Sequence, residues 1–407
     1  MALPLLPTSR LQWRPAASVC CSSREPRPTG SRRRRRSWAS TRAIAPTAPP
    51  HTSACSSDSA GRRSGVKGTQ SLMPRDQISG RARIYALYTG APRQLACKVV
   101  AELPRHAPLI PAPARREQLL LESELLYLIL SYQRSFFEFP FGIRYVQPTA
   151  EGIRLDLESN ASLDSLLAGL LPGRVRTGNG DDEIRGLNGC RITARSDRGI
   201  ELRRLGQPTS IRLTGPSRRA FQEAEAILAE RIHDHGGEAS WLAGDTWTTH
   251  ERLWEDERQP LPYESTWRDA AWLPSGLLRR LGLLHTVAVP QVVTGHEARL
   301  GEWWILELDH DADTGLRRAE LVQALTDPEH GLPLELRGHR DLTPGGSLGL
   351  ILLKSPDGTA TLQLRYDRFD YPVKPERAEM FAAIRRRIST VTGDAVLPMM
   401  PGCSATG

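Results

Sequence analysis

The sequence predicts an α+β fold, in which a disordered basic N-terminal tail precedes two mixed α+β domains. Three observations lead to this prediction. Large apolar side chains are sparse before residue 73, helical periodicity and strand-like alternation then take turns along the chain, and Gly236-Gly237 interrupts the pattern. A chain of 407 residues that is 39% hydrophobic and 25% charged has the length for two or three domains of ordinary composition.

Positive charge is concentrated in residues 1–72, which hold thirteen Lys and Arg side chains against two acids. Because this tail is rich in Pro, Ser, Ala and Arg, it cannot bury enough apolar surface to offset the entropy of ordering, and we expect it to be disordered. We expect the same of residues 396–407. Three interpretations of the tail stay open: a targeting peptide, a nucleic-acid-binding arm, or an extension upstream of a working start at Met73.

The body of the protein, from Met73 onward, carries 41 basic and 44 acidic side chains and is slightly acidic. This balance argues against a globally basic domain that coats nucleic acid. No apolar run approaches the roughly eighteen residues that span a bilayer, so we expect no membrane segment. Apart from Cys403 near the end of the chain, the cysteines of the body are Cys97 and Cys190, and they form no Cys-x-x-Cys pair. This usage indicates a reducing compartment, and we expect the cytoplasm.

The first domain is expected over residues 73–236, as a helical hairpin, a central helix and an antiparallel sheet. Helix 74–88 and a helix after Pro92 pair across Thr89-Gly90, and helix 117–132 is apolar on nearly all sides, which predicts a buried central position. A hairpin is expected at residues 141–146 and 153–157, followed by a short helix at 163–171 and a loop at 173–189. Three strands follow at 190–194, 200–202 and 210–213, and then a long helix with an apolar stripe at 217–233.

The second domain is expected over residues 237–395. It begins with a tryptophan-rich helical stretch and continues as α+β. Alternation and periodicity predict three strands and two helices in this part, the strands at 303–308, 348–354 and 360–366 and the helices at 316–325 and 375–391.

An acidic segment of this domain matches most of a calcium-binding loop. Asp309, Asp311 and Asp313 alternate, and Glu320 follows eleven residues after Asp309, so carboxylates stand at four ligand positions of such a loop. However, Thr314 stands where the loop needs glycine, and the preceding segment has the pattern of a strand instead of a helix. A polar turn between a strand and a helix is therefore the favoured interpretation, and we expect no metal or other cofactor.

Three histidines offer a second weak metal site. The site would combine the Asp309 loop with His233, His235 and His250. However, the segment that begins at His250 has Trp254 at the position where a zinc-protease helix has its second histidine. A helix end, where the dipole favours a nearby histidine, explains His233 and His235 equally well. The sequence holds no complete catalytic set, so catalytic residues stay unassigned and an enzyme is not favoured.

Two segments of the chain resemble known families. The stretch IYALYTGAPRQLA, residues 84–96, resembles the helix–Thr-Gly–helix segment of ribbon-helix-helix antitoxins, which implies a DNA-contacting basic strand just before it, at residues 73–80. The wider chain, through the segments 103–111, 283–287 and 304–309, is similar to uncharacterised proteins of GC-rich actinobacteria that are loosely associated with plasmids and integrated elements. The second resemblance implies no activity.

Two functional hypotheses follow. The leading one is a non-enzymatic accessory or regulatory protein of the cytoplasm that binds a protein partner or DNA through a local surface. The alternative is a hydrolase, metal-dependent in one version, that uses His233, His235 and His250 with the acidic loop at Asp309.

Overall fold

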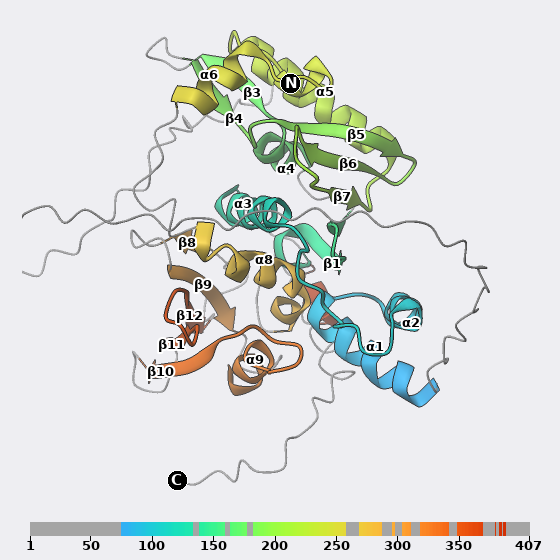
Figure 1. Cartoon of the computed structure of the whole chain (residues 1–407), viewed down its shortest axis with the longest axis vertical. Coiled ribbons are helices and arrows are strands. Elements are labelled where there is room, and N and C mark those ends of the chain that lie inside the picture. Colours follow the sequence, from blue (N-terminus) through green and yellow to red (C-terminus); the bar gives the residue numbers. More distant parts are fainter. Residues whose placement is uncertain are drawn as a thin grey trace, which may run out of the picture. The chain divides into compact units, whose positions relative to one another are not determined.

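The computed structural model confirms the α+β fold class (Figure 1). All of the described residues belong to one compact unit, Gln70–Gly407. The predicted tail 1–72 and the C-terminal residues 396–407 lie outside the described residues. The described ranges are 75–132, 138–158, 163–176, 182–257, 268–286, 295–297, 303–310, 318–341 and 348–368, with six further positions at 379, 382–384 and 386–387.

The two predicted N-terminal helices form and pack together, as α1 (Arg75–Thr89) and α2 (Arg93–Glu102). The turn between them is built from Thr89, whose hydroxyl donates to the Tyr85 carbonyl at 2.7 Å, and from Gly90 at φ +74°. The short helix η3 (Leu281–His285) packs against the end of α1. The approach is so close that a Cβ added to Gly282 would lie 2.1 Å from the Gly90 nitrogen.

The first sheet contains five strands in the order β1-β2-β7-β6-β5. The predicted hairpin and the three predicted strands are all present, and β2 pairs with β7 in parallel while the other neighbours are antiparallel. The bounds of these strands are β1 (Ile143–Pro148), β2 (Ile153–Leu157), β5 (Cys190–Ser196), β6 (Gly199–Arg204) and β7 (Ile211–Thr214).

Two helices, α4 (Leu163–Leu170) and α5 (Arg218–Asp234), pack against each other beside this sheet. Ser217 begins α5, and its hydroxyl accepts a hydrogen bond from the Ala220 backbone at 3.2 Å, as an N-cap residue does. The apolar stripe predicted for α5 is buried, and its members are Phe221, Ala224, Leu228 and Ile232.

The prediction of a loop at residues 173–189 is wrong. A hairpin of β3 (Gly173–Arg176) and β4 (Asp182–Arg185) occupies most of this segment. Each strand has four residues and contributes one buried apolar side chain, Val175 or Ile184, which is too short a pattern for alternation to be recognised in the sequence. An ion pair of 3.2 Å between Arg174 and Asp182 joins the two strands.

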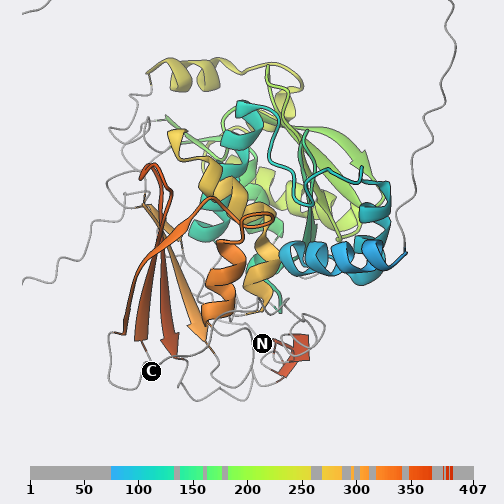
Figure 2. The ribbon, with the colours of Figure 1, turned by 60° about the horizontal axis from the view of Figure 1, so that its bottom comes forward.

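The second sheet also has five strands, in the order β10-β11-β12-β9-β8, with β9 and β12 parallel. Strands β9, β11 and β12 and helix α9 confirm the sequence prediction, whereas β8 and β10 were not expected. Figure 2 shows α8 and α9 beside this sheet. The bounds are β8 (Gly295–Glu297), β9 (Trp303–His310), α9 (Arg318–Leu325), β10 (Glu335–Asp341), β11 (Leu348–Lys354) and β12 (Thr361–Arg368).

Within its described residues, the tryptophan-rich stretch is helical over much of its length, as predicted. It contains η2 (Ser240–Ala243), α6 (Thr249–Glu257) and α8 (Trp272–Arg279). The predicted helix 375–391 lies largely outside the described residues, and the six described positions from 379 to 387 are helical.

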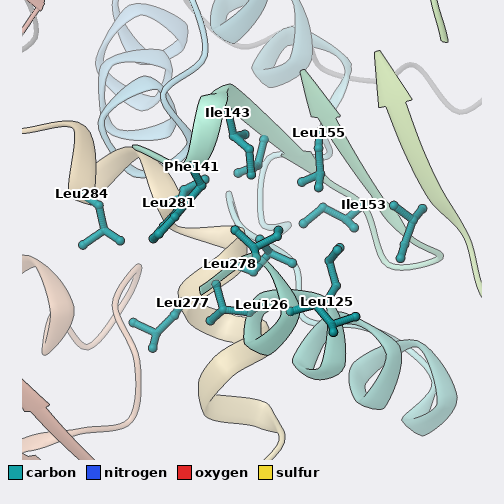
Figure 3. Packing of buried hydrophobic residues seen from close by; sticks show 14 of the residues in the cluster. Leu125, Leu126, Phe141, Ile143, Ile153, Leu155, Leu277, Leu278, Leu281 and Leu284 are labelled. Atoms are coloured by element: carbon teal, nitrogen blue, oxygen red, sulfur yellow. The ribbon is translucent and has the colours of Figure 1, made fainter. Parts of the chain in front are cut away.

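Helix α3 (Arg116–Tyr132) lies at the centre of the core, as its apolar sequence predicted. Figure 3 shows Leu125 and Leu126 of α3 beside Leu277 and Leu278 of α8, with Ile143 and Leu155 of the first sheet across the core from them. One hydrophobic cluster contains buried residues of α1, of the first sheet and of the second sheet. The expected boundary at Gly236-Gly237 therefore falls between two sheets that share one core. Among the described residues, the helices are all too short or too polar to cross a membrane.

A buried ion pair joins this central helix to α8. Glu122 of α3 and Arg279 of α8 are 0% and 1% exposed. Nε and Nη2 of Arg279 donate to the two carboxylate oxygens of Glu122 at 2.7 and 2.6 Å. The same carboxylate accepts hydrogen bonds from Ser275 at 2.7 Å and from Gln118 at 2.8 Å.

The network of this ion pair extends into the first sheet. Nη1 of Arg279 donates to the carbonyl of Pro111 and, at 2.8 Å, to that of Thr149 in the β1–β2 turn. Gln118 accepts from the Ser210 nitrogen at 2.7 Å and donates to the Ser210 carbonyl at 3.1 Å, just before β7. These hydrogen bonds compensate for the lost hydration of both charges, which is the condition for a buried ion pair to be tolerated.

Replacing Glu122 by Gln should destabilise the fold strongly. The substitution leaves the Arg279 guanidinium buried without its counter-charge, and breaking one side of such a pair costs about 3–5 kcal/mol in the free energy of unfolding. Urea denaturation followed by circular dichroism measures this difference. The matched control is Asp269→Asn, which breaks the exposed Arg116–Asp269 pair and should change stability by less than about 1 kcal/mol. Equal effects of the two variants would contradict the role of the buried network.

Candidate functional site

The first sheet has one face in the core and one polar face. In β2, Ile153 and Leu155 are buried in the core, and Arg154 between them lies on the other face, since successive side chains of a strand alternate. In β7, exposed Arg212 lies between buried Ile211 and Leu213, and in β6 exposed Arg203 follows buried Leu202. We call the polar face the arginine face and define it by Arg144, Tyr145, Arg154, Asp156, Glu201, Arg203, Arg212 and Thr214.

The strand register places arginines beside each other on this face. Arg154 of β2 is the direct partner of Arg212 in the parallel β2–β7 pair, and Arg212 is the direct partner of Glu201 in β6. Like charges directly opposite each other in a sheet are destabilising. The Arg154–Arg212 juxtaposition is therefore not explained by the stability of the sheet.

Two acids hold three of the arginines. The Arg144 guanidinium lies 2.5 Å from Asp156, and Glu201 accepts from Arg203 at 2.7 Å and from Arg212 at 3.1 Å. Burial acts to raise the pKa of Glu201, but the hydrogen bonds from the two arginines outweigh it and lower this pKa below its ordinary value. Glu201 is therefore ionised and orients two cations on the face.

Arg154 is held by neutral contacts. Its Nε donates to the Thr214 hydroxyl at 3.1 Å, and Thr214 donates in turn to Asp156 at 3.0 Å. Within the described ranges, no carboxylate lies at ion-pair distance from Arg154. Four arginines against two acids give the face an excess of positive charge. The side chains of Arg144, Arg203 and Arg212 are 44%, 55% and 57% exposed.

Arg191, a fifth arginine in the same strand register, is buried instead of exposed. Arg191 of β5 is the partner of Arg203, but its side chain is 1% exposed. Two of its nitrogens donate to the carboxylate of Glu251 in α6, at 2.9 and 2.6 Å, and the guanidinium also donates to the carbonyls of Gly244 and Thr246. Arg191 is thus fully used in fixing the segment before α6, whereas the arginines of the face keep exposed donors.

An exposed guanidinium offers several N–H donors in a planar fork, and this fork fits the oxygens of a phosphate or a carboxylate. The arginine face can therefore bind an anion with several negative charges. The sequence signal for the face was weak, because each strand contributes only one or two polar residues. The strand order, which brings β7 between β2 and β6, is what assembles them.

The predicted calcium-loop residues are only partly described. Asp309 lies in β9 and Glu320 in α9, so a strand does precede the segment and a helix follows it, while Asp311 and Asp313 lie outside the described residues. Throughout the part of the chain that is described, no group of three or more His, Cys, Asp or Glu side chains could hold a metal ion.

The three candidate histidines lie on two helices. His233 and His235 are exposed at the end of α5, where His235 Nδ1 is 2.7 Å from the Arg231 carbonyl. His250 lies in α6, with Nδ1 3.8 Å from a carboxylate oxygen of Asp182. The position at the end of α5 is the one that the helix-dipole interpretation predicts for the first two.

The helix pair that resembles the antitoxin segment belongs to the core. Thr89 is 0% exposed, and a Cβ added to Gly90 would lie 2.6 Å from the His285 ring. Residues 75–80 form the first turns of α1. The strand that the resemblance implies is therefore wrong for these residues, and the pair offers no antitoxin-type strand there for DNA.

His285 is the most perturbed histidine of the described residues. It is 1% exposed, and its ring lies edge-on to Phe139 with centroids 5.5 Å apart. The guanidinium of Arg387 lies over the same Phe139 ring, 5.5 Å from its centroid. Burial, and next the charge of Arg387, lower the His285 pKa to about 3, while a hydrogen bond with the Ile143 backbone acts in the opposite direction. The His285 ring is therefore neutral at physiological pH.

Comparison with protein families, curated proteins and solved structures finds no match to the chain. The basis for a function is therefore the geometry of the arginine face.

Acid should destabilise the protein in part through His285. The pKa is lower in the folded state than in the unfolded state, near 6.5, so the unfolded state binds the proton first, and stability falls as the pH falls from about 6.5 towards 3. At pH 5 the contribution is about 2 kcal/mol. Urea unfolding at pH 8 and pH 5 should show that His285→Leu loses correspondingly less stability on acidification than the native chain. An equal loss in both proteins would contradict the assignment.

Proposed function

We propose that the chain is a non-enzymatic accessory or regulatory protein of the cytoplasm that binds DNA through the arginine face. The observation that supports the proposal best is the pair Arg154 and Arg212. These side chains are direct register partners on neighbouring strands, and only Arg212 has an ion pair with a described carboxylate, that of Glu201. A phosphate bound between them would relieve their repulsion, and phosphate contacts dominate the affinity of proteins for DNA.

The chemistry of the face favours binding over bond cleavage. Its two acids are tied in ion pairs with arginines, and the pKa of Glu201 is lowered, whereas a general base works best with a pKa near the operating pH. Arginine contacts to phosphates position a protein on DNA without reading its sequence. We therefore expect binding that depends on salt and only weakly on base sequence.

Removing the two opposed arginines should weaken DNA binding and its salt dependence. In the full chain, Arg154→Ala combined with Arg212→Ala should lower the slope of log Kd against log salt by roughly 1.4–1.8, because each phosphate contact contributes about 0.7–0.9. Fluorescence anisotropy with a labelled DNA of about 20 nucleotides, measured at several salt concentrations, gives this slope.

The matched control is the double variant Arg116→Ala, Arg219→Ala. It removes two positive charges from exposed positions, one on α3 and one on α5. Arg116 is paired with Asp269, and Arg219 is paired with Glu223. The control should keep most of the slope. If both double variants changed the slope equally, total charge and not the arginine face would set the affinity. If neither lowered it, the DNA proposal would be dropped and a protein partner would become the favoured ligand.

A further inference from the structure

We infer that the DNA bound by the arginine face is single-stranded. This inference rests on the proposed function and concerns the same face. It depends on two features of the first sheet: its width, and the position of Tyr145 beside the arginines.

The sheet is too wide to enter a duplex groove. Five strands spaced about 4.8 Å apart span roughly 19 Å between the outer two, whereas the major groove of B-DNA is about 12 Å wide and admits a helix or a two-stranded ribbon. A duplex could touch such a face only along its phosphate backbone. A single strand can lie across it and present its bases as well.

Tyr145 gives the face an aromatic surface. It is the register partner of Asp156, which places it on the same face as Arg154. Helix α1 contacts β1 at this end of the face, and Tyr145 is half-buried against the hydrophobic cluster to which α1 belongs. Burial, and next the charge of Asp156, raise the pKa of the Tyr145 hydroxyl. The ring is thus held on one side by packing, and part of it stays accessible.

The spacing of these groups suits one nucleotide. Arg154 is the diagonal neighbour of Tyr145 across β1 and β2, and diagonal neighbours in a sheet lie about 7–8 Å apart. A phosphate on the Arg154–Arg212 pair would leave the attached base within reach of the tyrosine ring. Base stacking on an aromatic side chain needs an unpaired base, since a paired base is already stacked inside the duplex.

The test compares single-stranded oligo-dT with a duplex of the same length, both about 20 nucleotides long, on the full chain. We expect the single strand to bind at least about fivefold more tightly. Tyr145→Ala should weaken single-strand binding at least about fivefold and leave the salt slope unchanged, since it removes stacking and no charge. Tyr145→Phe keeps the ring and should bind like the native chain.

Tyr145→Leu keeps apolar volume without an aromatic face, so it separates stacking from loss of packing, and thermal unfolding checks that each variant is folded. The inference is overturned if the native chain binds the duplex as tightly as the single strand. It is also overturned if Tyr145→Ala or Tyr145→Leu binds the single strand as tightly as the native chain does. In those cases the Arg154 and Arg212 double variant would still lower the salt slope. If that double variant lowered the slope on neither probe, the proposed function itself would fail.

Discussion

The arrangement of the whole unit depends on the buried pair of Glu122 and Arg279. Two charges far apart in the sequence meet where helices α3 and α8 cross, and their remaining hydrogen-bonding groups reach backbone of the β1–β2 turn and, through Gln118, the start of β7. The hydrophobic effect is non-directional, whereas a buried ion pair offsets its desolvation only when its geometry is excellent. The pair therefore fixes which strand lies next to which helix.

This constraint also positions the surface proposed to bind DNA. The β1–β2 hairpin carries Tyr145 and Arg154, and β7 carries Arg212, so the network holds both strands whose juxtaposition creates the arginine pair. At the other edge of the same sheet, Arg191 of β5 and Glu251 hold the polypeptide around α6 in a similar way. Buried arginines act as connectors in this protein, and exposed ones supply charge.

The sequence predicted elements with long apolar patterns and missed those whose pattern is short or charged. Helix 217–233 was recognisable because four apolar side chains recur at helical spacing, and β11 because it is almost wholly apolar. Strands β3 and β4 have four residues each, and β10 is mostly polar, so none of them shows a clear alternation. Glu122 lies within a long helix rich in leucine, where nothing local indicates that its partner stands in α8. The arginine face was equally hidden, because it depends on the parallel pairing of β2 with β7.

The distance along the chain between Glu122 and Arg279 has a consequence for biosynthesis. A ribosome adds about 5–20 residues each second, so the acid emerges roughly 10–30 s before its counter-ion can. During that interval α3 presents an uncompensated carboxylate among leucines, and β2 waits for β7 to complete its sheet. Until α8 has been made, the central helix therefore lacks the counter-charge of its buried acid, and we expect the N-terminal half alone to be less stable than the full unit.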